Sequence, residues 1–386
     1  MLKAKYCIAL LAVLVIGISI RLVLFTSAFA EETATNIASD EPQLSEAQAA
    51  IVTDSTGQTL WSKNEDTQMS LASVTKVMTA MVALDSDVDL NATYTMTGVD
   101  LGPNSQTAGY KQNDQAMLSD LLDVMLVFSA NDAATEIARI VAGHEDAFVE
   151  RMNKKALELG MTHTHFTNVH GLEDAGNHYS SVHDMVLMGR HALRYYPLIA
   201  DIVTKRSVTV PIGDKNRTFK STDQLMDTYQ GLLGIKTGSV ESGTTFLGAA
   251  QRGEVRLYSA VLGCQTNEGR FADSAALLDW GFAHMSEKTM AEQDMVVRWA
   301  PFAYNFSFKC PIYASAAMGI VFDGAALNYS SLQYRPNTLV SSQDAYGATR
   351  WYQGERTVAI CSYHAGTPLL GVPSYDIFTT PHFYSV

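Results

Sequence analysis

Cysteine is scarce in this sequence, with four among 386 residues. No Cys-x-x-Cys pair and no cysteine–histidine spacing typical of a structural zinc site occurs. Cys7 lies in an N-terminal apolar segment, which leaves Cys264, Cys310 and Cys361 for the rest of the chain. We expect a disulfide between Cys310 and Cys361, because both lie in the C-terminal stretch, and a buried thiol at Cys264.

Positive charge is also in short supply. Lys and Arg total 27 against 40 Asp and Glu, a formal net charge of −13. Such an acidic chain is a poor partner for nucleic acid and offers no basic patch for anionic lipid. A neutral or peptide-like substrate remains compatible with this charge.

Long apolar runs are absent after residue 30. The first thirty residues place Lys3 and Lys5 before the run CIALLAVLVIGISI and end in small residues at Ala30. This pattern is typical of a secretory signal peptide, residues 1–30, and predicts an extracytoplasmic protein. Arg21 interrupts the run, so an uncleaved membrane anchor is the alternative.

Metal-binding patterns are missing as well. Five histidines fall between residues 163 and 183, but no HExxH or comparable spacing accompanies them. We therefore expect neither a metal nor a cofactor.

The remaining chain divides into three parts. Residues 31–46 are acidic and aperiodic and predict a flexible leader. Residues 47–288 combine helical and period-two patterns, whereas residues 289–386 are aromatic, β-branched and rich in turns. We expect an α+β domain over 47–288, followed by a small β-rich domain over 289–386.

Local patterns place the elements of the larger domain. Two short apolar runs flank DSTGQ and predict a hairpin. Helices are expected to begin at Ser73 and at Ser181. Two more are expected, one with Ser119 as its capping residue and one after Asn131 with Asp132 as its cap. The segments RSVTVPI, GLLGIKTG, TTFLGAAQ and VRLYSAVLG predict strands of one sheet. The other strands of this sheet come from the start of the domain, and the helices lie between the two groups of strands in the sequence.

The stretch SLASVTKVMTA carries the clearest chemical signal. A serine hydroxyl needs a base within hydrogen-bond reach to act as a nucleophile. Ser73 and Lys76 are three residues apart at the start of a helix, so both side chains share one face. Lys76 would work as a base only if burial or a nearby cation such as Lys236 lowered its pKa.

Two companion motifs make this pattern specific. SAN, with Ser129 and Asn131, lies between two expected helices, and the KTG of Lys236, Thr237 and Gly238 lies on an expected strand. With these motifs the sequence resembles the serine D-alanyl-D-alanine carboxypeptidases, the low-molecular-weight penicillin-binding proteins. The resemblance runs from about residue 49 to about residue 282. It includes DSTGQTLWSKN, LLDVMLVFSANDAA, MTHTHFTNVHGL, HYSSVHDM and RFADSAALLDWGF.

The resemblance implies a role for each matched residue. Ser73 would be acylated, Lys76 would take its proton, and Ser129 would relay a proton to the leaving D-alanine. Asn131 would hold the substrate amide. The expected carboxylate-binding and oxyanion groups are Lys236, Thr237, Gly238, Ser239 and Arg270, with the backbone N–H groups of Ser73 and Ser239 forming the oxyanion hole.

Two departures from the family pattern concern the groove. The first is SAN, which stands where many relatives have SGN, a change between small residues. The second follows the KTG motif: Ser239 stands where relatives often carry a larger side chain, and ESGTTF replaces their usual Ala-Gly-Tyr-Cys pattern. These differences alter the expected shape of the groove and remove no catalytic group.

The sequence therefore predicts a bacterial, secreted or wall-associated carboxypeptidase. Its expected partners are peptidoglycan stem peptides and, as inhibitors, β-lactams. A β-lactamase is disfavoured because no E-x-x-L-N string lies between Asn131 and Lys236. An endopeptidase using the same site, or a wall-binding protein that has lost turnover, stays open as an alternative.

Overall fold

The computed structural model describes residues 41–103, 105–302, 308–333 and 345–370. The predicted signal peptide, residues 1–30, and the first part of the predicted leader lie outside the described residues. Within these described ranges, no helix is long and apolar enough to cross a membrane.

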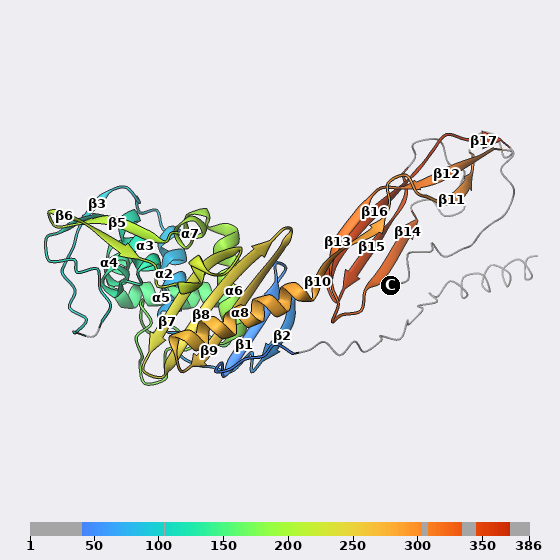
Figure 1. Ribbon diagram of the computed structural model, residues 1–386. Coiled ribbons are helices and arrows are strands. Elements are labelled where there is room, and N and C mark those ends of the chain that lie inside the picture. Colours follow the sequence, from blue (N-terminus) through green and yellow to red (C-terminus); the bar gives the residue numbers. More distant parts are fainter. Residues whose placement is uncertain (1–40, 104, 303–307, 334–344, 371–386) are drawn as a thin grey trace, which may run out of the picture. The chain divides into compact units, whose positions relative to one another are not determined.

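A five-stranded antiparallel sheet forms the centre of the larger domain, with the strand order β2-β1-β9-β8-β7 (Figure 1). The strands are β1 (Ala49–Asp54), β2 (Thr59–Lys63), β7 (Leu232–Val240), β8 (Gly243–Arg252) and β9 (Val255–Cys264). The first two form the predicted hairpin and pair with strands from the end of the domain. This arrangement confirms the expected α+β fold, in which helices are inserted between two parts of one sheet.

Both faces of this sheet are buried, because alternate side chains of a strand point to opposite faces. On β9, Tyr258 and Ala260 belong to the core on one side, and Leu257 and Val261 to the core on the other. Helix α8 (Asn267–Ala283) covers the second side, and α6 (Val182–Tyr195) packs on the first. Helix α8 contains the segment RFADSAALLDWGF, which carries part of the family resemblance.

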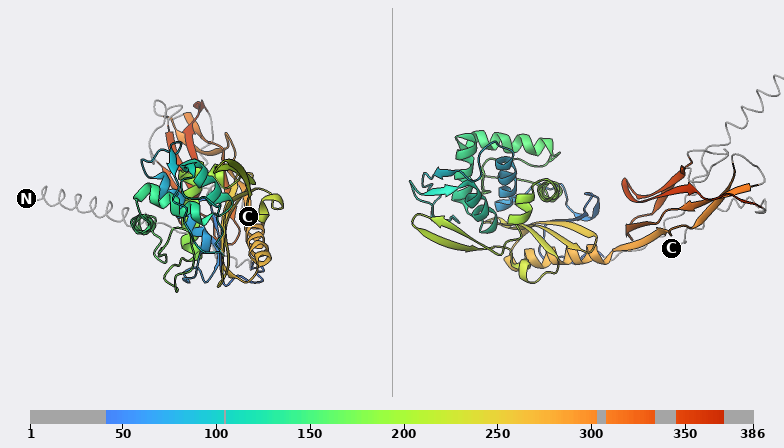
Figure 2. Two further views of the ribbon diagram at one scale, coloured as in Figure 1. Left: turned by 90° about the vertical axis from the view of Figure 1, so that its left-hand side faces the viewer. Right: turned by 90° about the horizontal axis from the view of Figure 1, so that it is seen from above.

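A group of helices packs together with α6 on the first side of the sheet (Figure 2). Its helix α2 is buried along nine of its ten residues, because neighbouring helices surround it. The elements are the short η1 (Ala72–Val74), α2 (Thr75–Leu84), α3 (Leu118–Val127), α4 (Asn131–Ala142), α5 (Glu145–Glu158) and α7 (Pro197–Ile202).

The helix caps agree only in part with the predictions. Ser181 caps α6, since its Oγ accepts a hydrogen bond from the backbone N–H of Asp184 at 3.2 Å. Ser119 was expected to cap α3, but that helix begins at Leu118 with Met117 as the preceding residue. The Ser119 N–H instead donates to the carbonyl of Leu90.

One strand prediction was wrong. The segment RSVTVPI forms β5 (Ser207–Ile212), which pairs with β6 (Lys215–Lys220) in a separate two-stranded sheet. A tight turn at Gly213 joins these strands, and local pairing competes successfully with addition to the central sheet. The other short elements of this domain are β3 (Thr93–Thr95), which pairs with β4 (Gln115–Met117), and η2 (Gln224–Asp227).

Residues just before the predicted boundary at residue 47 are in contact with the larger domain. The backbone N–H groups of Ser45, Glu46 and Ala47 all donate to the carboxylate of Asp273 on α8, at 2.7–2.9 Å. The last residues of the predicted leader are therefore fixed to the larger domain.

The C-terminal part is β-rich, as predicted. One sheet has the order β11-β12-β16-β15-β14, with β17 added to β12, and β10 pairs with β13. The strands are β10 (Met285–Ala291), β11 (Val296–Pro301), β12 (Phe308–Ala314), β13 (Ala317–Phe322), β14 (Asn328–Gln333), β15 (Ala345–Gln353), β16 (Arg356–Ala365) and β17 (Leu369–Leu370). The predicted division after residue 288 falls inside β10, whereas the change from helix to strand occurs at Met285.

The expected Cys310–Cys361 disulfide is not formed. The buried Cys361 is a thiol whose Sγ donates to the carbonyl of Ser315 at 3.2 Å. Cys310 lies on β12 and Cys361 on β16, and the register that pairs Ile312 with Ala365 offsets the two cysteines by six residues along the strands. That offset corresponds to about 20 Å, beyond the reach of a disulfide.

Candidate active site

Ser73 and Lys76 form the centre of the site. Ser73 lies in η1 and Lys76 in the first turn of α2, so the three-residue spacing brings the Lys76 Nζ to 2.8 Å from the Ser73 Oγ. The same Nζ donates to the backbone carbonyl of His170 at 2.6 Å. Lys76 is completely buried, whereas Ser73 is partly exposed and accessible to a ligand.

The surroundings favour a neutral Lys76 amine. Burial and, secondly, the cation of Lys236 hold the pKa of Lys76 well below the usual range of lysine, although Asp132 acts in the opposite direction. A lysine without its proton can accept one from the serine hydroxyl. The pair is thus arranged as a nucleophile with its base.

Two glycines allow other segments to approach the backbone around Ser73. A Cβ on Gly171 would lie 1.9 Å from the carbonyl oxygen of Ala72, and a Cβ on Gly238 would lie 2.8 Å from the Cβ of Ala72. Ala72 itself has a positive φ of 49°. The loop before Gly171 and strand β7 therefore hold the nucleophile turn from two directions.

The second motif lies between α3 and α4. Ser129 is buried and has a φ of 71°, an unusual backbone conformation for a residue with a side chain. Asn131 is buried at the start of α4, and its Nδ2 donates to the Oγ of Ser105 at 2.7 Å. Among the described contacts, no hydrogen bond joins Ser129 to Ser73 or Lys76.

Asp132 does not cap α4 as expected. It is the second residue of the helix, and its carboxylate accepts backbone hydrogen bonds from Ala108, Gly109 and Tyr110 at 2.8–3.2 Å. The Asn131 N–H also donates to the carbonyl of Gln106 at 2.8 Å. Asp132 therefore fixes the loop over residues 105–110 against the second motif.

The third motif lies on β7, as predicted. Lys236 and Thr237 are buried there, and Ser239 at the end of the motif is exposed. The Lys236 Nζ donates to the carbonyl of Thr237 at 3.0 Å, and the Thr237 hydroxyl lies 2.5 Å from that of Thr222. Burial, together with the nearby Arg270, lowers the pKa of Lys236 to about 7.

Arg270 reaches β7 from α8. Its Nη1 donates to the carbonyl of Gly238 at 2.6 Å and to the Oγ of Ser239 at 3.2 Å, and its guanidinium lies over the ring of Phe271. The side chain is nine-tenths buried, and burial lowers the pKa of Arg270 to about 10, so it stays charged at neutral pH. A positive charge is thus held directly behind the strand of the third motif.

The structure also reveals site residues that the sequence reasoning missed. They are Ser105, the carbonyl of His170, Thr222 and Asp223. A main-chain carbonyl leaves no trace in the residue pattern, and Asp223 lies in the unremarkable string STDQL. Each acquires its place only through segments remote in sequence.

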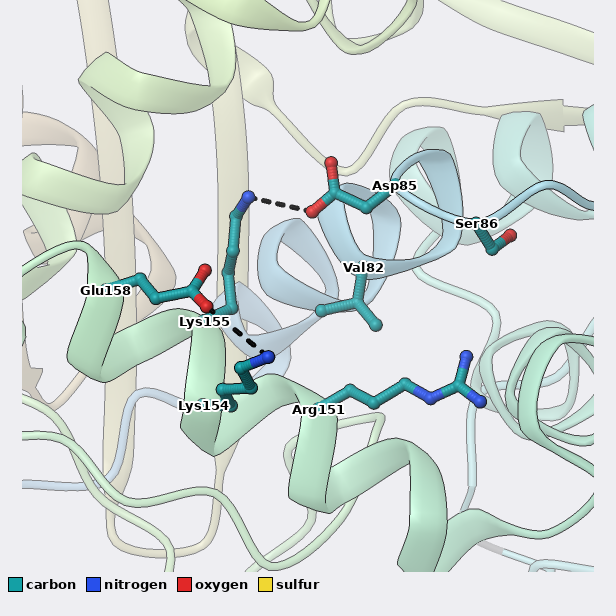
Figure 3. A pocket seen from close by; sticks show the side chains of 7 residues that line it. All are labelled: Val82, Asp85, Ser86, Arg151, Lys154, Lys155 and Glu158. Atoms are coloured by element: carbon teal, nitrogen blue, oxygen red, sulfur yellow. Dashed lines mark hydrogen bonds and ion pairs between the residues drawn. The ribbon is translucent and has the colours of Figure 1, made fainter.

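A separate surface pocket lies near the other end of α2 (Figure 3). Asp85, just after α2, pairs there with Lys155 at 2.7 Å. Asp85 is twelve residues from Ser73, about 18 Å along a helix, so this pocket is not part of the catalytic site. Its lining residues are Val82, Asp85, Ser86, Arg151, Lys154, Lys155 and Glu158.

A serine nucleophile beside a buried lysine, on an α+β fold with buried cations behind an edge strand, defines a serine acyl-transfer enzyme. Comparison with known proteins gives the family. The D-alanyl-D-alanine carboxypeptidase family, peptidase S11, matches residues 35–266. The D-alanyl-D-alanine carboxypeptidase DacB2 of Mycobacterium tuberculosis is 37% identical over 243 residues, covering 61% of this chain and 82% of the relative.

Solved structures agree with this result. Penicillin-binding protein 5 of Haemophilus influenzae is similar with a TM-score of 0.64 and 26% identity, over 85% of this chain and 98% of that protein. Penicillin-binding protein D2 of Listeria monocytogenes, in its ampicillin-bound form, has a TM-score of 0.57 and 31% identity over 63% of this chain and 100% of that protein. The chain belongs to the D-alanyl-D-alanine carboxypeptidase family and is a serine hydrolase of that type.

Proposed function

We propose that this enzyme removes the terminal D-alanine from peptidoglycan pentapeptide stems through an acyl-enzyme on Ser73. The observation that carries the proposal is the 2.8 Å separation between the Ser73 Oγ and the Nζ of a fully buried Lys76. Lys76 takes the hydroxyl proton while the Ser73 Oγ attacks the carbonyl of the penultimate D-alanine. The negative charge on the tetrahedral oxygen is stabilised by the backbone N–H groups of Ser73 and Ser239.

The acyl-enzyme forms when the peptide C–N bond breaks. Ser129 passes a proton to the departing amine and regains one from the Lys76 ammonium, so D-alanine leaves with a neutral amino group and Lys76 is neutral again. Water then attacks the ester carbonyl and gives a proton to Lys76. The bond to the Ser73 Oγ breaks, Ser73 regains its proton from Lys76, and the shortened peptide is released as a carboxylic acid. Asn131 holds the substrate amide, and its contact with Ser105 keeps its side chain oriented.

The carboxylate of the substrate needs positive charge at the end of the site. Lys236 and Thr237 on β7 would bind it, and Arg270 would add its charge from behind the strand. β-Lactams carry a carboxylate and a reactive amide carbonyl in a similar arrangement, so we propose that they acylate Ser73. A homologue has been solved in an ampicillin-bound form, which supports this part of the proposal.

The place of action is part of the proposal. Peptidoglycan lies outside the cytoplasmic membrane, and the N-terminal residues 1–30 have the pattern of a secretory signal. We therefore place the enzyme outside the cytoplasm of a bacterium. Protease accessibility of the enzyme in intact, wall-stripped cells would check this placement.

Intact-mass spectrometry after addition of benzylpenicillin tests the chemistry. A long-lived adduct is expected on the wild type and none on Ser73→Ala, together with D-alanine release from an N-acylated peptide ending in D-Ala-D-Ala. A transient adduct with consumption of penicillin would identify a β-lactamase instead. Absence of any adduct, or D-alanine release by Ser73→Ala, would overturn the proposal.

A further inference from the structure

Asp223 is a buried carboxylate that the mechanism above does not use. It precedes η2, is 9% exposed, and its Oδ1 accepts the backbone N–H of Leu225 at 2.9 Å. Its Oδ2 is buried and has no hydrogen-bond partner among the described residues. A buried carboxylate oxygen without a partner is costly, so its charge state depends on what else the site contains.

The neighbouring residue joins Asp223 to the third motif. Thr222 contacts Thr237 through their hydroxyls at 2.5 Å, and η2 packs on β7. The Nε of Arg270 is likewise buried without a hydrogen-bond partner among the described residues. Arg270 contacts the strand that carries Lys236, and Asp223 precedes η2, which packs on the same strand. Two buried groups of opposite charge, each with one unsatisfied atom, thus adjoin this strand.

Several charged groups act on one another around this point, and Glu268 of α8 and Cys264 of β9 also act on Arg270. Asp223 is acted on by Arg270 from α8 and by Lys236 from β7. Lys236 is acted on by Arg270 and Asp223, and it acts in turn on Lys76 of α2. Burial outweighs both cations at Asp223 and raises its pKa to about 6.

We propose that Asp223 is a specificity-determining residue that opposes the substrate carboxylate when ionised and admits it when protonated. This inference rests on the proposed function, because it concerns the carboxylate assigned there to Lys236 and Arg270. An anionic ligand placed beside these cations competes with Asp223 for the same positive charge. Binding of the ligand therefore drives uptake of a proton by Asp223, by thermodynamic linkage.

Two ligands isolate this effect from the chemistry of Ser73 and Lys76. Benzylpenicillin carries the carboxylate, and its methyl ester lacks the charge but reacts at the same β-lactam carbonyl. The ratio of their second-order acylation rate constants, measured by intact mass at pH 5.5 and 8.5, cancels the titration of the shared nucleophile and base. What remains is the pH dependence of carboxylate recognition.

The decisive variant is Asp223→Asn, which keeps the Oδ1 acceptor for Leu225 and removes the charge. At pH 5.5 its ratio should be close to the wild-type ratio, because wild-type Asp223 is then mostly protonated. At pH 8.5 Lys236 is largely neutral in both proteins, and only the wild type retains the opposing anion. We expect the ratio there to be roughly tenfold higher in Asp223→Asn than in the wild type.

Asp227→Asn is the matched control. Asp227 lies on η2, close in sequence to Asp223, but it is exposed and pairs with Arg206. This variant should follow the wild type at both pH values. If Asp223→Asn fails to fold, Asp223→Ser is a second charge-free variant, because its hydroxyl can also accept the Leu225 N–H. A fall of the wild-type ratio alone would not be enough, since Lys236 loses its charge over the same pH range.

A wild-type ratio that does not change with pH would overturn the proposal, as would equal ratios for the wild type and Asp223→Asn at pH 8.5. Failure of both ligands to acylate the wild type would instead overturn the proposed function, and this inference with it. The two kinds of failure are therefore distinct.

Discussion

His178 and Thr75 form a buried hydrogen bond of 2.7 Å between the ring Nε2 and the hydroxyl, next to the turn that carries Ser73. The other ring nitrogen, Nδ1, accepts the backbone N–H of Thr167 at 3.1 Å, so the proton of the neutral ring lies on Nε2. Thr75 in turn donates to the carbonyl of Ala72 at 2.7 Å. A neutral histidine thus supports the nucleophile turn through one threonine.

The first prediction concerns acid stability. Burial lowers the pKa of His178 to about 4, below the ordinary value near 6.5. The unfolded chain therefore binds more protons than the native protein between these values, and native stability falls as pH falls through this window. As pH falls through this window, the free energy of unfolding of His178→Gln should fall by about 3 kcal/mol less than that of the wild type.

Urea unfolding at pH 7.5 and pH 4.0 measures that difference. His178→Gln should be less stable than the wild type at pH 7.5, because Thr75 and Thr167 lose a well-placed partner. Between the two pH values it should lose less stability than the wild type. His170 remains in both proteins, and its pKa is lowered first by burial and by Lys76 and only after these by His178, so most of its contribution cancels. Equal losses would show that His178 does not titrate in this way.

The second prediction tests Lys76 as the base. Lys76→Arg replaces the amine with a guanidinium, which does not release its proton at physiological pH. Acylation by benzylpenicillin should therefore fall by roughly a thousandfold or more. Lys154→Arg, an exchange at an exposed lysine of α5, should leave the rate unchanged. Wild-type acylation in Lys76→Arg would exclude the lysine as the base.

The third prediction concerns the close contact at Gly171. Gly171→Ala places a methyl group 1.9 Å from the carbonyl oxygen of Ala72, so the nucleophile turn must move. Gly176 has a similar positive φ, 84° against 88°, but nothing lies within 4 Å of its added Cβ. Gly176→Ala therefore measures the backbone strain alone, about 1–2 kcal/mol.

Thermal unfolding and penicillin acylation of both variants separate the two effects. Gly171→Ala should lose at least a further 2 kcal/mol of stability and most of its acylation rate. Gly176→Ala should acylate like the wild type. Similar behaviour of the two variants would mean that the loop at Gly171 does not set the position of Ser73.

The fourth prediction concerns Asp132. Asp132→Asn replaces a carboxylate that accepts three backbone hydrogen bonds from the loop over residues 108–110 with a group that has one acceptor oxygen. We expect a loss of about 2 kcal/mol in the free energy of unfolding and a raised KM for the D-Ala-D-Ala peptide, because the loop bearing Ser105 is released. Asp146→Asn is the control, since Asp146 lies exposed in the first turn of α5.

Chemical denaturation and steady-state kinetics provide these values. A variant that loses stability without any change in KM would confine Asp132 to a structural role. Asp146→Asn should change the free energy of unfolding by less than about 0.5 kcal/mol.

The sequence alone predicted the parts of this enzyme that depend on short-range geometry. The spacing of Ser73 and Lys76 brings their side chains together because neighbours three residues apart share a helix face. Period-two patterns predicted the strands of the central sheet, and the family resemblance predicted which motifs meet. Its ordered motifs were enough to indicate the family that the comparisons establish.

Only the tertiary structure decided the contacts that depend on register and on remote segments. The offset of six residues between Cys310 and Cys361 follows from how β12 pairs with β16, and neither strand's own pattern specifies it. Pairing of β5 with β6, rather than with the central sheet, is a competition between alternative neighbours. The carbonyl of His170 beside Lys76 and the carboxylate of Asp223 near Lys236 lie 94 and 13 residues from their partners in sequence. Such juxtapositions arise from the packing of the whole domain, which local pattern does not contain.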